Sequence, residues 1–381
     1  MCVDDGISRD EKCMDETSVG GDEDEIPGIN NVPNIDDAFF EKDIPGVEQH
    51  LKSPVYRLLI NPRTVTQKKL VTPKTVIRFC LERGIFTSSI IEFKLSRRPL
   101  EKFAGWARHM LGFPHVRTML DQAQVTRAIQ ASGELFIYHD ASGIVALFAR
   151  WCIPTHTFIC RWGEFTITLE DVAALMHLPI TGNLPGDLSD EETAVSHVLT
   201  AAMEKANKAG SKGCYASWLT HWWPKDEVYD KPIDGMLPIA AFLCLWLSRD
   251  VFEDSGNLLK PFVIPFAIKM AQGEQLPIGT LFLGSLYYNL DSLIIDSSVS
   301  NGSMKIECYA NTMFLQALMW ENFKNYAPTP RNVLQGPNTD ARHTFPEKDN
   351  ARIMRWSTKQ PRSKIRFIDV LDEESEFNFR P

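Results

Sequence analysis

Residues 157–179, TFICRWGEFTITLEDVAALMHLP, carry the clearest secondary-structure signals in this 381-residue chain. Two β-prone runs, Thr157–Cys160 and Phe165–Thr168, stand on either side of Arg161-Trp162-Gly163-Glu164. Short β-prone runs separated by a glycine-containing turn are typical of a β-hairpin. The first half of the stretch therefore predicts a hairpin with these four residues at its tip.

A helix is expected directly after the hairpin. Thr168 precedes Asp171 by three residues, which is the spacing of a capping box with Asp in place of Glu. Glu170 and Asp171 place negative charge on the first turn, where the helix dipole favours it. Apolar residues at helical spacing continue through 172–176, and Pro179 ends the helix.

A second helix start lies at Ser189, because Glu192 follows it at the spacing of a capping box. Apolar residues at helical spacing run through 195–206 and give this helix one apolar face. Gly210 is expected to end it, and residues 211–217 are expected to form a loop.

Three later blocks, 236–247, 261–271 and 276–290, are apolar nearly all round, which predicts helices at the centre of a domain. The most apolar block, 236–247, is far shorter than the roughly 20 residues that span a bilayer, so no membrane partner is expected. Residues 100–112 and 309–323 predict two further helices.

Weaker signals lie nearer the N-terminus. A helix is expected between Thr75 and Gly84, and a short strand at Ile90–Leu95. Composition supports a globular core, since 44% of residues are hydrophobic and 23% are charged. The predicted fold class is mainly α, more fully α+β with a small β-hairpin, in a multi-helix globular domain.

The net charge of −9 is unevenly distributed. Residues 1–48 hold fifteen acidic and three basic residues, a net charge of −12, so the rest of the chain carries +3. Such a segment cannot bury enough apolar area to offset its ordering entropy. We expect a disordered acidic tail over 1–50, a domain over 51–330, and a loosely packed extension over 331–381 that is first basic and then acidic.

Eight cysteines are scattered without a disulfide framework, which indicates a reducing compartment. Cys152, His156 and Cys160 are four residues apart, but Pro154 argues against a helix that would gather them. A single strand would spread them over more than roughly 20 Å. No metal site is expected.

Trp218, His221 and Trp222 form an aromatic cluster that could stack a ligand or meet a partner. The alternative is a packing block in the core or at a domain edge. Arg161, Trp162 and Glu164 at the hairpin tip are the other candidate partner surface, because exposed Arg and Trp side chains are typical of binding hot spots. Here the alternative is structural, with Trp162 covering the helix that follows.

A basic strip near the C-terminus has no acidic residue within it. It is a candidate for phosphate contacts or nuclear import, and the alternative is a solvated face. Its cationic residues are Arg352, Arg355, Lys359, Arg362, Lys364 and Arg366.

Motifs for catalysis are missing from the sequence. It holds no Gly-x-Ser-x-Gly, no phosphate-binding loop and no Gly-x-Gly-x-x-Gly after a strand, so neither an enzyme nor a cofactor is expected. The helix over 169–177 also does not begin a helix-turn-helix, because a loop from Pro179 to Gly186 follows it.

Several segments together carry a family resemblance: Leu147–Phe158, Trp162–Val172, Leu175–Gly182, Phe242–Arg249 with Val251-Phe252, and Phe314–Glu321. They resemble the plant mobile domain, a family also described as aminotransferase-like. The similarity covers roughly residues 100–330, although Phe165 stands where Ala is usual and His177 where Gly is common.

The resemblance implies a plant nuclear protein, with a cytoplasmic location as the alternative. It implies transposon silencing, gene regulation or meristem maintenance, through phosphatase-like or chromatin-associated protein partners. No catalytic residues are established for the family, so none is assigned here. A sequence-tolerant nucleic-acid binder, a copy derived from a mobile element, and an enzyme with an unrecognised site remain as alternative functions.

Overall fold

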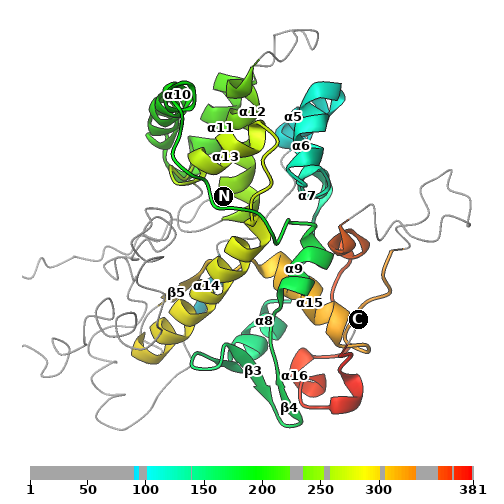
Figure 1. Ribbon diagram of the computed structural model, residues 1–381. Helices are drawn as coiled ribbons and strands as arrows, with labels where there is room; N and C mark the ends of the chain where they lie inside the picture. Colours follow the sequence, from blue (N-terminus) through cyan, green and yellow to red (C-terminus); the bar gives the residue numbers. More distant parts are fainter. Residues whose placement is uncertain are drawn as a thin grey trace, which may run out of the picture. The chain divides into compact units, whose positions relative to one another are not determined.

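Helices dominate the part of the chain that the computed structural model describes (Figure 1). The predicted acidic tail and the helix expected between Thr75 and Gly84 lie outside this part. The described residues are 90–93, 101–138, 140–223, 235–252, 258–300, 305–331, 351–362 and 364–379.

Two groups of elements emerge from the packing within the described ranges. In the first group, α12 packs against α5, α11 and α13, and α10 packs against α11 and α13. Its members are α5 (Glu101–Gly112), α6 (Pro114–Gln122), α7 (Thr126–Glu134), α10 (Asp190–Asn207), α11 (Gly210–Trp222), α12 (Met236–Trp246), the π-helix η2 (Leu247–Val251) and α13 (Val263–Ala271).

The second group forms around the long helix α14, which packs against α9, β2 and β5. Helix α15 contacts α8, α9 and η4 there, and α16 covers α8. The helices of the second group are α8 (Ala141–Phe148), α9 (Leu169–Met176), α14 (Ile278–Ser300), α15 (Thr312–Asn322), the 3-10 helix η4 (Arg352–Trp356), α16 (Phe367–Val370) and the 3-10 helix η5 (Glu374–Glu376).

Two small sheets complete the fold, which confirms the predicted mainly α class with a hairpin. Strand β1 (Ile90–Phe93) pairs in parallel with β5 (Lys305–Cys308), in register from Ile90 opposite Lys305 to Phe93 opposite Cys308. The polar residues around Lys305 suggest a solvated loop, but Lys305 lies in strand β5. It ion-pairs with Glu92 on the paired strand at 2.8 Å.

The predicted hairpin is present and gains one strand, but its second strand lies at Gly163–Phe165 and not at Phe165–Thr168. Strands β2 (Trp151–Cys152), β3 (Thr157–Cys160) and β4 (Gly163–Phe165) form an antiparallel sheet in that order. Cys160 lies opposite Gly163, so Arg161 and Trp162 form a two-residue turn. Gly163 has a φ of 150°, a conformation that glycine adopts at little cost.

Both predicted capping boxes are present. Thr168 accepts a hydrogen bond from the Asp171 amide at 3.2 Å, and the Asp171 carboxylate accepts from the Thr168 amide at 2.7 Å. Ser189 and Glu192 make the same reciprocal pair at the start of α10. Each box supplies hydrogen-bond acceptors to backbone amides that have no acceptor within the first helical turn.

His177 closes α9 in the left-handed conformation, with a φ of 52°. A side chain with a Cβ is strained there, and helices usually place glycine at this position. His177→Gly is therefore expected to raise the free energy of unfolding by about 1 kcal/mol. Urea denaturation measures this change.

The matched control for His177→Gly is Lys208→Gly at the C-terminal end of α10. Lys208 has right-handed helical dihedral angles, φ −60° and ψ −24°. Glycine relieves no strain there, so this change should lower stability by roughly 0.5–1 kcal/mol. Equal effects at both positions would contradict the interpretation of His177 as a strained cap.

The loop predicted for residues 211–217 is wrong, because α11 runs through them from Gly210 to Trp222. Gly213 and Ser211 lower the intrinsic helix propensity of this segment. Packing against α10 and α12 overrides that preference. The apolar side chains that make this packing favourable include the fully buried Trp218.

Residues 351–379 also differ from prediction, since they are packed and not loose. Ile353, Trp356, Phe367, Leu371 and Phe377 are all buried. These residues are widely spaced among charged ones, so no apolar periodicity marks them in the sequence. The segment is held by short helical turns that each insert one or two large side chains.

By length and composition, helix α14 is long and apolar enough to cross a membrane. In the domain, 39% of that stretch is buried. Polar side chains on the helix nevertheless bond to the three-stranded sheet region. Trp151 donates to the Asp291 carboxylate at 2.7 Å, and the Tyr287 hydroxyl donates to the Ile167 carbonyl at 2.5 Å. These contacts are those of a helix packed inside a domain.

Candidate functional site

The hairpin tip holds the C-terminal segment against the second group. The Trp162 indole donates to the Leu371 carbonyl at 3.0 Å, and its ring lies 4.6 Å from that of Phe377. The Arg161 amide donates to the Asp372 carboxylate at 2.9 Å. Trp162 therefore covers residues more than two hundred positions later in the chain.

Asp372 is the polar centre of this contact. It also accepts from the Arg150 guanidinium at 2.5 Å. Burial, together with the charge of Asp372, raises the pKa of the nearby Cys160 thiol to about 11. That thiol stays protonated near neutral pH, which leaves it a poor nucleophile.

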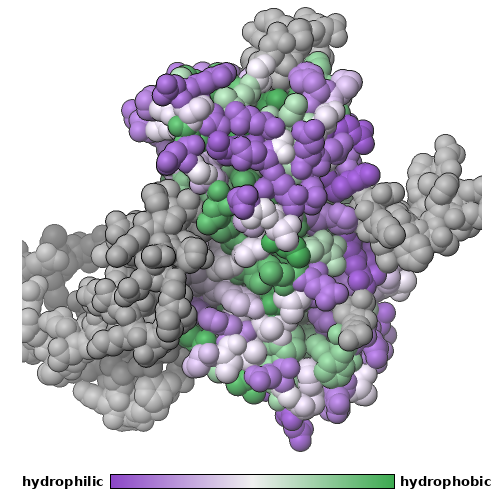
Figure 2. Space-filling model, viewed as in Figure 1, coloured by the Kyte–Doolittle hydropathy of each residue, from purple (hydrophilic) through white to green (hydrophobic). Residues whose placement is uncertain are grey.

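Large apolar side chains remain exposed on the hairpin and on the C-terminal segment that contacts it. Phe379 is 65% exposed and lies 5.7 Å from Trp162, while Ile159 on β3 and Ile368 on α16 are nearly half exposed. Figure 2 shows moderately apolar surface over the elements near α16, bordered by hydrophilic residues. We name this set the tip surface: Ile159, Arg161, Trp162, Ile368 and Phe379.

Glu164 belongs to the hairpin but not to its turn. It lies directly opposite Ile159 in the β3–β4 register, so the two side chains share a face of the sheet. Its carboxylate accepts from the Thr157 hydroxyl at 2.7 Å, which fixes it as a cross-strand contact on that face.

Trp218, His221 and Trp222 lie on α11 in the first group, away from the hairpin elements. Trp218 is fully buried and donates to the Ala241 carbonyl at 3.0 Å, so it is a core residue. Trp222 packs 5.5 Å from Trp218, and the exposed His221 meets Trp222 edge-on at 4.9 Å. Trp218 is therefore a packing residue of the core, the alternative to a ligand site. The cluster lies on other elements than the tip surface.

The basic strip is largely engaged in internal contacts. Arg352 and Arg355 both pair with the buried Glu321 on α15, the former at 3.0 Å. Arg366 pairs with Asp369 at 2.6 Å, and Arg362 donates to the Asn325 carbonyl at 3.1 Å. Within the ranges the structure covers, Lys359 and Lys364 are the members of the strip for which no such contact is seen.

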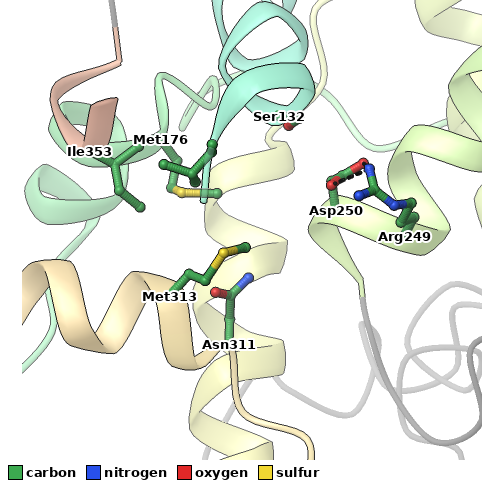
Figure 3. Close-up of a pocket in the computed structure, with 8 residues that line it drawn as sticks. Ser132, Met176, Arg249, Asp250, Asn311, Met313 and Ile353 are labelled. Carbon is green, nitrogen blue, oxygen red and sulfur yellow. Dashed lines mark hydrogen bonds and ion pairs between the residues drawn. The ribbon is translucent and has the colours of Figure 1, made fainter. Parts of the chain in front are cut away.

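A small cavity lies where the two groups meet (Figure 3). Its volume is about 20 Å³, enough for roughly one water molecule. Ser132 of α7 and the Arg249–Asp250 pair of η2 reach it from the first group, and Met176 and Asn311 from the second. The cavity is too small for a substrate, so it is a candidate only for a structural water.

The Arg249–Asp250 pair is the feature of this junction that sequence reasoning missed. Arg249 donates to both carboxylate oxygens of Asp250, at 3.0 and 3.1 Å, and its guanidinium lies 5.0 Å from the centre of the Phe103 ring. Both side chains are buried in a π-helical turn, a rare form that recurs at functional sites. The signal for this pair in the sequence is that Arg249 and Asp250 follow closely after the apolar run 236–247.

A second missed cluster ties the β2–β3 turn to α14. His156 lies 3.0 Å from the Asp291 carboxylate, and its ring stacks on those of Trp151 and Tyr287, which also contact each other. Its φ of 51° places it in the left-handed region, and its carbonyl accepts from the Thr166 hydroxyl. The cluster orders the turn, and no bond from a thiol to His156 is seen among the described residues.

The chain reverses direction between Cys152 and Thr157, and does not run from Cys152 to Cys160 as a single strand. His156 faces Asp291 and not either cysteine. Throughout the described ranges, no three His, Cys, Asp or Glu side chains gather closely enough to hold a metal ion.

Comparison with known proteins finds one curated relative. Protein MAIN-LIKE 1 of Arabidopsis thaliana is 26% identical over 176 residues, which are 44% of this chain and 34% of that protein. The chain thus spans about a third of the length of that curated relative. No solved structure matches the chain.

The family model described as plant mobile domain matches residues 125–381. The match includes the hairpin, the capped helix α9 and the packed C-terminal segment, and neither matching name describes a catalytic family. Because this match covers more than half of the sequence, the chain belongs to the plant mobile domain family.

Proposed function

We propose that this protein is a nuclear protein-interaction factor, working in transposon silencing, gene regulation or meristem maintenance, and not an enzyme. The family resemblance supplies the nuclear setting and the biological roles. The observation that carries the interaction role is the two-thirds exposed Phe379, whose ring lies against Trp162 at the hairpin turn, with Ile159 exposed on β3 and Ile368 exposed on α16. Exposed apolar side chains beside an arginine and a tryptophan are typical of partner-binding surfaces.

The titratable groups give further support to a binding role. Burial is the first cause of the raised pKa of the Cys160, Cys214 and Cys244 thiols. Burial likewise raises the pKa of the Tyr287 and Tyr326 hydroxyls. Each shift makes the group a weaker nucleophile at neutral pH, the opposite of what nucleophilic catalysis requires.

Direct nucleic-acid binding is the weaker candidate. Phosphate recognition needs cations that are free to meet the ligand. Four of the six strip residues (Arg352, Arg355, Arg362 and Arg366) instead bond to groups within the domain. We therefore place the interaction surface at the hairpin tip and not along residues 352–366.

The test is affinity capture of the tagged full chain from plant nuclei, comparing the wild type with an Ile368→Ser, Phe379→Ser double variant. A phosphatase-like or chromatin-associated partner should be retained by the wild type and reduced about tenfold or more by the variant, since hot-spot contacts carry most binding energy. Both side chains are exposed, so the melting temperature should change little.

The matched control is Val198→Ser on α10, which removes an equally exposed apolar side chain from the first group. This variant should retain the partner. Equal capture by all three proteins would refute the tip surface as the interaction site. Recovery of the chain from cytosol alone would refute the nuclear role.

A further inference from the structure

The backbone is strained at Thr358, just after η4. Thr358 has a φ of 63°, in the left-handed region that β-branched residues rarely adopt. Its amide donates to the Phe136 carbonyl at 2.6 Å. The preceding residue, Ser357, is buried, and its hydroxyl accepts from the Phe136 amide. The chain is therefore held firmly up to the Thr358 amide, and the strain lies at the point where that hold ends.

Residues 366–379, which we name the docked segment, pack against the hairpin and the end of α15 (Figure 1). Asp372 in this segment pairs with Arg150 at 2.5 Å, and the Asn378 amide donates to the Asn322 carbonyl at 2.7 Å. Because these contacts are specific and mostly buried, the segment fits one surface closely. Its buried side chains are Phe367, Val370, Leu371 and Phe377.

Few hydrogen bonds hold the linker between Thr358 and the docked segment. Among its described residues, the Lys359 amide donates to the Trp356 carbonyl at 3.0 Å, and Arg362 donates to the Asn325 carbonyl at 3.1 Å. Fully extended, the seven residues 359–365 span roughly 25 Å. That length is enough to carry the docked segment onto a neighbouring molecule.

Thr358 is placed to act as the hinge for such a movement. A rotation about its φ moves only the atoms that follow its nitrogen, so the bond from its amide to Phe136 stays intact. The same rotation into the extended region removes the strain of the left-handed conformation. Strained hinges of this kind favour the exchange of a segment between identical chains, because the segment finds the same docking surface on each copy.

The strain also sets the concentration at which exchange competes with docking in the same chain. A short flexible linker holds the segment near its own docking surface at an effective concentration on the order of millimolar. Relief of the strain at Thr358 favours exchange by about tenfold in each of two chains. The expected dissociation constant of the exchanged dimer is therefore on the order of 10 μM.

We propose that this protein forms a dimer by exchanging the docked segment between two copies of the chain. Asp372 of each copy pairs with Arg150 of the other, and Phe377 of each copy packs beside Trp162 of the other. The exchange is reciprocal, so it closes a two-fold dimer. Each tip surface then combines the hairpin of one chain with Phe379 of the other. The dimer does not depend on the proposed function.

Two full-length variants with reversed charges test the exchange, Arg150→Asp in one chain and Asp372→Arg in the other. Each variant alone brings like charges together, both within its monomer and in an exchanged dimer with itself. In an exchanged dimer of the two variants, both contacts join opposite charges. Sedimentation velocity should therefore show a heterodimer when the variants are refolded together from urea at about 50 μM, above the expected dissociation constant, and no dimer of either alone. A mixture that forms no heterodimer would overturn the proposal.

Thr358→Gly tests the hinge without changing the docking contacts. Glycine adopts a φ of 63° at little cost, so the dimer loses its advantage and its dissociation constant should rise about tenfold or more. Lys208→Gly, at a right-handed helical position in α10, should leave the dissociation constant unchanged. The proposal also fails if the wild type stays monomeric at about 100 μM, or if its dimer is equally tight in Thr358→Gly.

Discussion

Glu321→Ala is expected to lower the free energy of unfolding by about 3–5 kcal/mol, because it leaves buried charges without a partner. The Glu321 carboxylate is 2% exposed and accepts from Arg355, from Arg352 at 3.0 Å and from the Trp356 indole at 2.5 Å. Both arginine side chains are only 22% exposed, so water cannot replace the lost carboxylate fully. Chemical denaturation measures the loss.

The control for this prediction replaces the whole cluster. Changing Glu321, Arg352 and Arg355 to Met together should give a stability close to that of the wild type, since a buried ion cluster and a well-packed apolar one are often comparable. If the triple variant is as unstable as Glu321→Ala, packing and not charge pairing is the main contribution of these residues.

Glu192→Ala should cost a similar amount, about 3–5 kcal/mol, for two separable reasons. The carboxylate caps α10 by accepting from the Ser189 amide at 2.7 Å. It also holds the Lys269 ammonium at 2.8 Å, with both side chains largely buried. Without it, the capping box is broken and a buried ammonium on α13 loses its partner.

Glu192→Gln distinguishes the two contributions. Glutamine keeps the shape and can still accept from the Ser189 amide, as Gln does in other capping boxes, but it carries no charge. Its cost should therefore be smaller than that of Glu192→Ala, and the difference measures the cap. Equal losses would mean that the cap contributes little and that the ion pair dominates.

The two glutamates should show opposite pH dependence. The hydrogen bond from Lys269 lowers the pKa of Glu192, so its contribution is present above the unfolded pKa and is lost as pH falls through the folded pKa. Burial raises the pKa of Glu321 despite the two arginines, so its contribution is present below the unfolded pKa and is lost as pH rises through the folded pKa. Stability differences between the wild type and each Gln variant, measured from acidic to neutral pH, should therefore have opposite slopes.

Patterns among residues close together in the sequence account for what could be predicted from it. The hairpin and both capping boxes depend on residues within a few positions of one another, and all three are present. The loop predicted over 211–217 failed because the packing of α11 against α10 and α12 outweighs the low helix propensity of its glycines.

The site contacts depend on residues far apart in sequence, and no local pattern reveals them. Asp291 is 135 residues from His156, and Trp162 bonds to Leu371 across 209 residues. The basic strip illustrates the consequence: its cations were visible in the sequence, but their partner Glu321 lies inside an apolar helix about thirty residues earlier. Arg161 and Trp162 stay candidate partner residues, and the sequence did not reveal the C-terminal segment that contacts them.

The contact between the hairpin tip and the C-terminal segment has a consequence for biosynthesis. Arg161 and its partner Asp372 are separated by 211 residues. At roughly 5–20 residues per second, a ribosome needs on the order of ten to forty seconds to make that intervening chain. During this interval the hairpin turn lacks the cover that Leu371 and Phe377 give it, so this contact forms only after the C-terminal segment has emerged.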